Sequence, residues 1–308
     1  MYDIYQKTLG TKVTFEGVGL HTGKKCKVTL LPGNEDSGIV FKRVDIKSNN
    51  FINANFKNVT STKLCTTLEN SHGVKVSTVE HLLAAIYITG IDNVVIEVDN
   101  EEVPIMDGSA KNFIDILNKV EITNLSKKRK YLKVLDRVEL INGDRKISIE
   151  PSHSTFEVDF QLNFENRVIG KQRNKFNLLT DNIKDISDSR TFCLYEDIEK
   201  IKKNGLAKGG SLDNAIVVDN YKVLNEGGLR NKKEFVNHKI LDLIGDLLLS
   251  GYRLIGKIKC YQGGHELSNM FLKKLFKNKP SINLIELNDL TISNKQNSNQ
   301  INKIAVNA

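Results

Sequence analysis

One stretch of the sequence places ionisable side chains at the spacing of helix turns. His238, Asp242 and Asp246 lie four residues apart within HKILDLIGD, and the positions between them are almost all apolar. In a helix these side chains share one stripe, because residues four apart are neighbours on adjacent turns. An imidazole and a carboxylate on such a stripe can bind one metal ion. The alternative is an exposed polar face, and this stretch alone does not decide between the two.

A second candidate group is the STVEH segment that ends at His81, directly before an apolar run. If His81 meets His238 and Asp242, three protein ligands leave one position of a tetrahedral metal open for water, which is the pattern of a catalytic site. Glu80 cannot easily bind the same ion as its neighbour, but it could take a proton from that water as a general base. Without such partners, a Glu-His pair before a helix means little.

Two further histidines stand beside glycines. His265 follows two of them in QGGH, where the backbone can bend tightly before the last helix. With its pKa raised by a nearby Asp246, this imidazole would be protonated and could stabilise an oxyanion or protonate a leaving amine. The alternative is a histidine in a flexible loop. His21, in GLHTG, is either a turn residue or a substrate contact.

The candidate residues lie on or beside predicted helices and strands, and the first part of the chain is rich in predicted strands. The first half predicts strands at 12–15, 25–30 and 39–41, a helix at 79–88, a strand at 93–98 and a helix at 111–120. Ser77 or Thr78 can cap the helix at 79–88, and Gly90 can end it.

The second half repeats this order. A paired-strand pattern returns at 131–149, followed by a helix at 234–251, a strand at 254–261 and a helix at 267–276. The candidate groups are spaced alike, since 26 residues separate His81 from Asp107 and 27 separate His238 from His265. We therefore expect two copies of one unit with a ligand between them. Chance similarity of two α+β halves is the alternative.

Composition narrows the classes of protein. The 308 residues carry 45 Lys and Arg against 37 Asp and Glu, a formal net charge of +8, and 40% are hydrophobic, which supports at least one core. The basic residues are diffuse and the densest run, 127–130, is typical of a solvated linker, so we expect no nucleic-acid partner. The chain begins without a secretory signal pattern and has no apolar run long enough to span a bilayer. Scattered cysteines without CxxC spacing argue against a thiolate site and predict a cytoplasmic protein.

A series of segments, in one order, resembles the UDP-3-O-acyl-N-acetylglucosamine deacetylase family, the zinc amidases of lipid A biosynthesis. The resemblance covers about residues 8–287. The segments are GVGLHTGK at 17–24, LCTTL at 64–68, STVEHLLAA at 77–85, IDNVVIEV with VPIMDGSA at 91–98 and 103–110, SRTF at 189–192, GGSLDNAIVVD at 209–219, VLNEGGLR at 223–230 and EFVNHKILDLIGDL at 234–247.

The resemblance implies an α+β fold of two similar domains that form a β-α-α-β sandwich, with all helices between the two sheets. The first domain is expected at 1–124 with a small sheet insert near 59–76, and residues 125–130 are expected as a linker. The second domain is expected at 131–290 with a βαβ insert near 190–219, and residues 291–308 as a flexible tail.

Carried over residue by residue, the resemblance also implies the central chemistry. His81, His238 and Asp242 match the zinc ligands, Glu80 the general base and His265 the general acid. The implied reaction removes the N-acetyl group of UDP-3-O-(3-hydroxyacyl)-N-acetylglucosamine and releases acetate. Zn²⁺ is the implied cofactor, and Fe²⁺ also suits two histidines and a carboxylate.

Further roles follow from the same resemblance. Thr191 and Lys239 match groups that stabilise the oxyanion, Asp246 the partner that tunes the general acid, Cys65 a thiol near the metal and Phe164 an aromatic that stacks on uracil. Part of the positive charge, with Lys239, would meet the diphosphate. The apolar passage for the acyl chain has six candidate lining residues: Phe192, Leu194, Ile198, Ile201, Leu212 and Ala215.

Two features depart from the family pattern, and two other functions remain open. Cys193 stands where a glycine is usual, and residues 266–270 differ from the common small and polar stretch. Both departures bear on the width of the acyl passage and on the preferred acyl length. One alternative is a related metal-dependent deacylase acting on another N-acyl nucleotide sugar. The other is a basic nucleic-acid-binding protein with a structural metal. We expect a monomer that acts on a small-molecule substrate.

Overall fold

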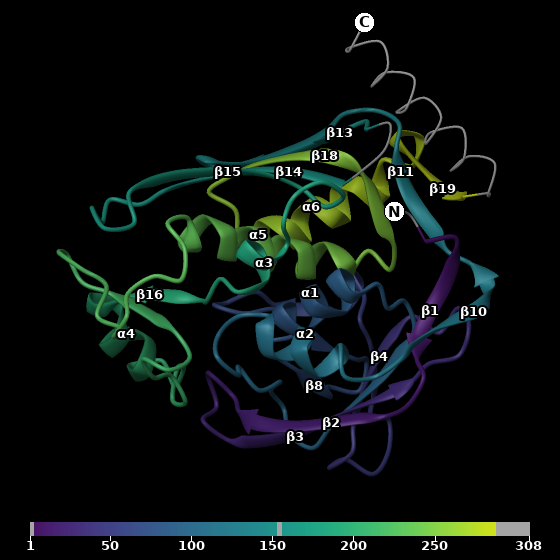
Figure 1. Cartoon of the computed structure of the whole chain (residues 1–308), viewed down its shortest axis with the longest axis horizontal. Coiled ribbons are helices and arrows are strands. Elements are labelled where there is room, and N and C mark those ends of the chain that lie inside the picture. Colours follow the sequence, from purple (N-terminus) through teal and green to yellow (C-terminus); the bar gives the residue numbers. More distant parts are fainter. Residues whose placement is uncertain (1–2, 153–155, 288–308) are drawn as a thin grey trace, which may run out of the picture.

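The computed structural model describes residues 3–152 and 156–287, which form a layered α+β fold (Figure 1). Two large sheets enclose a central layer of helices, in which α1 (Glu80–Thr89) and α5 (Glu234–Leu248) pack against each other. Both helices are buried along almost their whole length. The expected α+β class, with helices sandwiched between two sheets, is confirmed.

The first sheet lies below the helices in Figure 1. Its strands are, in spatial order, β2 (Val13–Val18), β3 (Lys25–Pro32), β9 (Val94–Val98), β4 (Ile39–Arg43) and β5 (Phe51–Asn53). Apolar residues alternate along β3, where Cys26, Val28 and Leu30 are buried, while Lys25 and Lys27 are exposed and Thr29 is partly exposed. That alternation turns one face of the sheet toward the helices.

The second sheet lies above them. In spatial order, its main strands are β12 (Val138–Asn142), β13 (Arg145–Glu150), β18 (Arg253–Tyr261), β14 (Phe156–Asn163) and β15 (Lys171–Asn177). Two further strands extend the sheet: β11 (Lys130–Val134) pairs in parallel with the first residues of β18, and β19 (Ile282–Glu286) pairs antiparallel with β11.

The two sheets share one topology. In each, the strand that follows the long helix, β9 or β18, lies in the middle, antiparallel to one neighbour and parallel to the other. Read in spatial order, β2-β3-β9-β4-β5 and β12-β13-β18-β14-β15 correspond strand by strand in position and direction. The repeat expected from the sequence is therefore present in the strand order. The domain boundaries at 1–124 and 131–290 stay predictions.

Smaller elements interrupt each half. In the first, β6 (Val59–Ser61), β7 (Thr67–Glu69) and β8 (Lys75–Val76) form a three-stranded sheet. In the second, β16 (Phe192–Leu194) and β17 (Ile216–Val218) pair in parallel with α4 (Ile198–Lys203) between them in sequence. The remaining elements are α2 (Lys111–Leu117), α3 (Lys184–Ser187), and the 3-10 turns η1 (Phe56–Asn58), η2 (Tyr195–Asp197) and η3 (Lys279–Ser281).

Helix ends differ from the expectation more than helix positions do. Gly90 ends α1 with a φ of 85°, as expected, but neither Ser77 nor Thr78 caps its start. Val79 holds the cap position, and Thr78 has a φ of 57° and donates its hydroxyl to Glu102 at 2.8 Å instead. A buried carboxylate thus competes with the helix start for the capping hydroxyl.

Two other helices have different ends from those predicted. The helix expected at 111–120 stops at Leu117. The last helix, α6 (His265–Lys277), begins two residues before the expected start. His265 is therefore the first residue of a helix rather than a residue of a flexible loop.

The expected linker at 125–130 stays a prediction: Ser126, Lys127, Lys128 and Lys130 are exposed, but part of the segment lies in strands and one residue is buried. Strand β10 (Ile122–Lys128) pairs with β1 (Tyr5–Leu9), and β11 starts at Lys130. Arg129 between them is buried and donates to Asp92, Asp3 and the Gly90 carbonyl. Burial is tolerated because the donors of the guanidinium are shared among carboxylates and a carbonyl.

The expected tail at 291–308 lies outside the described residues. Within the described ranges, no helix has the length and apolar character needed to cross a membrane.

Candidate active site

Three ligand-type side chains from two helices converge in the helical layer. Asp242 Oδ1 lies 3.3 Å from the Nε2 atoms of both His81 and His238, and all three ligand atoms lie within 4.8 Å of one another. His81 belongs to the first turn of α1, whereas the other two are one turn apart on α5. All three side chains are buried. The structure thus brings together the three residues that the sequence proposed as ligands.

A glycine permits this helix crossing. A Cβ atom added to Gly245 would lie 2.0 Å from the Glu80 carbonyl oxygen, far inside any permitted contact. Gly245 lies one turn beyond Asp242 on α5, so the two helices are closest beside the cluster. The absence of this one side chain allows His81 to reach the residues of α5.

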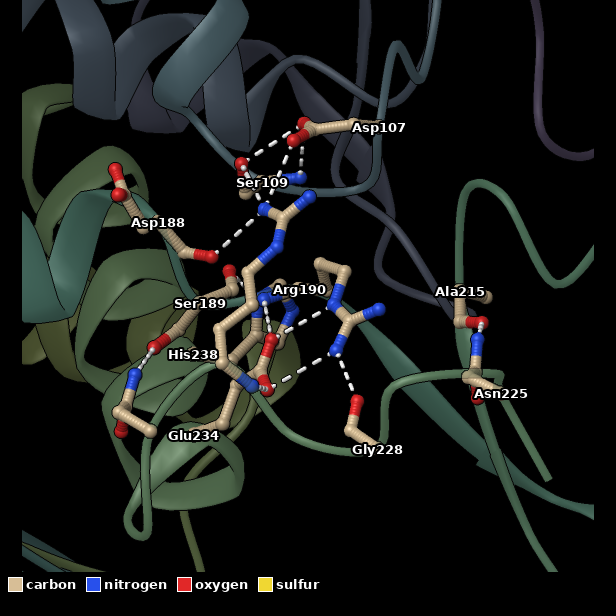
Figure 2. A network of polar contacts seen from close by, with 12 residues as sticks. Asp107, Ser109, Asp188, Ser189, Arg190, Ala215, Asn225, Gly228, Glu234 and His238 are labelled. Atoms are coloured by element: carbon tan, nitrogen blue, oxygen red, sulfur yellow. Dashed lines mark hydrogen bonds and ion pairs between the residues drawn. The ribbon is translucent and has the colours of Figure 1, made fainter. Parts of the chain in front are cut away.

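The protonation state of His238 is defined by its surroundings. Burial lowers the pKa of His238 to about 3, so the imidazole is neutral. Its Nδ1 lies 3.1 Å from the Ser189 carbonyl oxygen (Figure 2). Because a carbonyl only accepts, Nδ1 carries the proton and Nε2 presents a lone pair to the cluster.

The two oxygens of Asp242 have different partners. Lys239 Nζ donates to Oδ2 at 2.9 Å, whereas Oδ1 is buried without a hydrogen-bond donor in the part of the chain that the structure describes. Burial acts to raise the pKa of Asp242, but His238 and Lys239 outweigh it and hold the pKa well below its usual value. A buried carboxylate oxygen that faces two imidazole nitrogens fits a divalent metal ion.

Glu80 lies next to this cluster. Its Oε2 accepts from the Thr66 backbone N–H at 3.0 Å, and its Oε1 lies 3.8 Å from His265 Nε2. Complete burial raises the pKa of Glu80. A raised pKa suits a carboxyl group that must take up and release a proton near neutral pH.

Asp246 connects His265 to the same network. Its Oδ2 lies 3.0 Å from His265 Nδ1, and its Oδ1 accepts from the Thr66 hydroxyl at 2.7 Å. Burial acts to lower the pKa of His265, but Asp246 and Glu80 outweigh it and raise that pKa to about 10. The imidazole is therefore a cation at neutral pH, with one edge toward Asp246 and the other toward Glu80.

A pocket of about 640 Å³ opens over these groups. Thr191, Phe192 and Lys239 line it together with the cluster, Glu80 and His265. Lys239 Nζ also stands 5.4 Å from the centre of the Phe192 ring. Besides the His265 cation, Lys63, Arg145 and Lys239 bring positive charge to this polar pocket.

A second pocket, of about 340 Å³, adjoins the polar one and shares Thr191 and Phe192 with it. Most of its lining is apolar and comes from the insert around α4. Five of the six expected acyl-passage residues line this apolar pocket: Phe192, Ile198, Ile201, Leu212 and Ala215. Leu194, the sixth, is not among the residues that line this pocket, and it packs against the main hydrophobic core.

Comparison with known proteins agrees with this geometry. The sequence profile of the LpxC family, UDP-3-O-acyl N-acetylglycosamine deacetylase, matches residues 6–277. A UDP-3-O-acyl-N-acetylglucosamine deacetylase of Pasteurella multocida (strain Pm70) is 42% identical over 289 residues, 93% of this chain and 94% of the relative. The chain belongs to this deacetylase family.

Other relatives of the same name match over similar lengths. The protein of Pseudoalteromonas translucida (strain TAC 125) is 42% identical over 275 residues, 88% of this chain and 90% of the relative. That of Citrifermentans bemidjiense (strain ATCC BAA-1014 / DSM 16622 / JCM 12645 / Bem) is 43% identical over 284 residues, 92% of each chain. The deacetylase family match therefore extends across both sheets.

Besides Leu194, three residues that the family resemblance assigned to the site are not among those that line either pocket: Asp246, which contacts His265, and also Cys65 and Phe164. Cys65 is buried, its Sγ lies 3.9 Å from Thr67 Oγ1, and burial raises its pKa to about 12, so it is a neutral thiol. Phe164 meets the Phe192 ring edge to face at 5.7 Å. The roles of Cys65 and Phe164 in the deacetylase, beside the metal and on uracil, stay predictions.

The sequence reasoning missed Thr66, which bridges Glu80 and Asp246. It lies in the LCTTL segment, so the family resemblance marked its neighbourhood but gave it no role. His21 lies in a turn, as one of the two expectations had it, and it is also buried and lines both pockets, so the substrate contact stays a prediction. Asp107, the expected counterpart of His265, instead pairs with Arg230 at 2.8 Å.

Proposed function

We propose that this chain removes the N-acetyl group of UDP-3-O-(3-hydroxyacyl)-N-acetylglucosamine, leaving a free amine and acetate, the committed step of lipid A biosynthesis. Family membership supports the reaction. The observation that carries it is the adjacency of a His-His-Asp cluster and an apolar pocket. One site is suited to an amide, and the neighbouring one to the acyl chain of the same molecule.

The cofactor in this proposal is Zn²⁺, held by His81, His238 and Asp242, and Fe²⁺ is the second metal that the same ligands suit. When bound, such an ion polarises the amide carbonyl and makes a water molecule more acidic. The protein contributes a neutral His238, whose lone pair faces the cluster, and an Asp242 oxygen with no competing donor in the described chain.

In this mechanism Glu80 takes the proton from the attacking water. The Thr66 N–H holds one carboxylate oxygen, so the other is left to face the pocket. General bases of this kind typically contribute about 10²- to 10⁴-fold in rate.

His265 supplies a proton to the leaving glucosamine nitrogen. Its raised pKa keeps it protonated at neutral pH, and Asp246 holds its Nδ1 so that Nε2 turns toward Glu80 and the pocket. Thr191 and Lys239 also line the pocket, where they would stabilise the oxyanion. A single such donor is typically worth about 3 to 4 kcal/mol of transition-state stabilisation.

The charged and apolar parts of the substrate suit different pockets. The diphosphate is an anion, and Lys63, Lys239 and Arg145 supply positive charge at the polar pocket. Phe164 remains the candidate for stacking on uracil. The acyl chain would lie against apolar residues of the second pocket, among them Phe192 and Leu212.

We infer further that the enzyme is a cytoplasmic monomer. All four cysteines are free, and Cys26, Cys65 and Cys260 are buried, which suits a reducing compartment. The family match favours neither of the alternatives drawn from the sequence, a deacylase for another nucleotide sugar or a nucleic-acid-binding protein.

A deacetylation assay tests the function. Purified protein is incubated with UDP-3-O-(3-hydroxyacyl)-N-acetylglucosamine, acetate release is followed with and without a chelator, and bound metal is measured. We expect release that the chelator stops and that added Zn²⁺ restores. Equal or faster release from a different N-acyl UDP-sugar, or release that is insensitive to metal removal, would contradict the proposal.

A further inference from the structure

A buried ion pair near the cluster takes no part in lining the polar pocket. Glu234 is the first residue of α5, one turn before His238, and is fully buried. Its Oε1 accepts from Arg190 Nε at 2.8 Å and from the Arg190 backbone N–H at 3.1 Å (Figure 2). Its Oε2 accepts from the Arg230 backbone N–H at 2.6 Å. One carboxylate therefore holds two separate loops against the start of α5.

Stability alone does not account for this ion pair. Glu234 is 0% exposed and Arg190 8% exposed, so both charges have lost nearly all their water. Buried ion pairs are weak evidence for stability, because the loss of hydration offsets the attraction, and apolar side chains often replace them without loss. What apolar side chains cannot replace is the set of directional hydrogen bonds. These point to a role in orientation.

The residues on both sides of Arg190 reach the active site. The Ser189 carbonyl oxygen faces His238 Nδ1 at 3.1 Å, and Thr191 lines the polar pocket. Glu234 holds Arg190 by its backbone N–H as well as by its guanidinium. The direction of the Ser189 carbonyl and the place of Thr191 therefore depend on the same carboxylate.

The segment 187–191 is also attached to the first half of the chain. The Ala110 N–H donates to the Ser187 carbonyl at 3.0 Å, and the Thr191 N–H donates to the Gly108 carbonyl at 2.8 Å. The segment thus lies between the loop before α2 and the start of α5, with hydrogen bonds to both.

Arg230 links Glu234 to the first half of the chain by further hydrogen bonds. Its backbone is bound to Glu234, while its Nη1 donates to Asp107 at 2.8 Å and to the Asp188 carbonyl at 2.9 Å. Asp107 belongs to the first half, so the polar contacts of Glu234 continue across both halves that supply the cluster.

The two histidines of the cluster differ in how the protein holds their Nδ1 atoms. His81 Nδ1 has no hydrogen-bond partner among residues 3–152 and 156–287, whereas His238 Nδ1 is bound to Ser189. Of these two imidazoles, only His238 has a tautomer fixed by the protein. Hydrogen bonds of this kind orient a metal-binding histidine, and their loss typically weakens metal binding or activity about 10- to 100-fold.

We propose that Glu234 is a positioning residue for the metal centre, which holds Arg190 so that the Ser189 carbonyl fixes His238 and Thr191 stays at the pocket. The inference rests on the metal site of the proposed function. Without the carboxylate, segment 187–191 loses its anchor on α5, and His238 is free to exchange tautomers and rotate away from Asp242.

The test compares two ion pairs that each hold a buried arginine. Glu234→Gln keeps the shape of the side chain but removes its charge. Asp92→Asn does the same to the partly buried partner of Arg129, and this second pair lines neither the polar nor the apolar pocket. Zn²⁺ affinity is measured by competition with a chromophoric chelator, thermal stability by melting, and His238 by its ring ¹⁵N shifts.

We expect about 10- to 100-fold weaker Zn²⁺ binding in Glu234→Gln, with altered His238 shifts and a kcat at saturating Zn²⁺ that falls more than KM rises. Asp92→Asn should keep the Zn²⁺ affinity of the parent even if it melts earlier. Unchanged affinity in Glu234→Gln, or an equal loss in both variants, would overturn the inference.

If Glu234→Gln does not fold, Arg190→Lys replaces it, because a lysine keeps the charge but cannot bind the carboxylate and the Gly228 carbonyl together. The same loss of Zn²⁺ affinity supports the inference, and a parental affinity overturns it. If the His81→Ala variant still binds Zn²⁺ as the parent does, the metal site of the proposed function is wrong. Failure of the proposed function can therefore be told apart from failure of the role proposed for Glu234.

Discussion

The polar pocket and the apolar pocket adjoin, but they are built in different ways. The polar one rests on α1 and α5, two long buried helices that cross at Gly245 and carry His81, His238 and Asp242. The apolar one is formed by short elements, strands of three residues and a helix of six, and by the segments that connect them, which include the exposed Leu212.

This difference separates two tasks. Groups that do chemistry must be held in narrow geometry, which rigid helices and buried hydrogen bonds provide. A pocket for an acyl chain needs only apolar area of the right length, since burial of apolar surface is not directional. Changes in the polar pocket should therefore affect metal and turnover, and changes in the apolar pocket should affect only chain preference.

The largest expected effect comes from His81→Ala. The substitution removes one of the three proposed protein ligands, so metal content and acetate release should both fall to background. Metal analysis and the deacetylation assay measure this. Parental metal content and turnover in His81→Ala would show that the His-His-Asp cluster is not the metal site.

Glu80→Gln should separate metal binding from chemistry within the polar pocket. The amide keeps the shape of the side chain but cannot take a proton, so kcat should fall about 10²- to 10⁴-fold while metal content stays at the parental level. Stopped or initial-rate assays with parallel metal analysis check it. Near-parental turnover would mean that the base is another group.

Gly245→Ala should disturb the polar pocket through the backbone. The added methyl would meet the Glu80 carbonyl, and overpacking of this kind typically costs about 1 to 3 kcal/mol, so the protein should melt earlier and bind metal more weakly. Thermal melting and chelator competition measure both. An unchanged melting temperature and unchanged metal affinity would show that the contact between α1 and α5 tolerates a methyl group at position 245.

Asp246→Asn should shift the pH dependence of activity. In the parent, the pKa of His265 is about 10, so the protonated general acid persists below that pH and is lost as the pH rises through it. Removing the carboxylate lowers this pKa, so the basic limb of the kcat/KM profile should move to lower pH. A basic limb at the parental position would contradict the assignment of His265.

The smallest effect is expected from Ala215→Leu in the apolar pocket. The added carbons occupy space for the acyl chain, and a misfit of about 1 to 3 kcal/mol corresponds to a rise in KM of about 5- to 150-fold for long chains only. A substrate series of increasing acyl length tests this, with metal content as the control. An equal loss for short and long chains would break the separation between the pockets.

Much of the site could be predicted from local patterns. The stripe of His238, Asp242 and Asp246 is visible because helix periodicity relates residues four apart. The order of elements in the two halves also follows from short-range periodicity and turn residues, and it anticipated the matching strand orders of the two sheets.

Other features depend on contacts that no local pattern contains. Thr66 bonds to both Glu80 and Asp246, although Asp246 lies 180 residues away in sequence. Arg129 belongs to a run of basic residues that is typical of solvated surface, yet it is buried because three acceptors from distant segments surround it. Thr78 could cap a helix, but Glu102 takes its hydroxyl.

Local patterns along the chain are enough to identify the chemical types, most of the helices and strands that carry them, and the family to which the chain belongs. They do not show that Asp242 Oδ1 faces both His81 and His238, or that the Ser189 carbonyl sets the tautomer of His238. The two kinds of information differ in the distance along the chain over which they act. Periodicity and turn chemistry act within a few residues, whereas the meeting of α1 and α5 depends on close packing at Gly245, which is settled when the two halves come together.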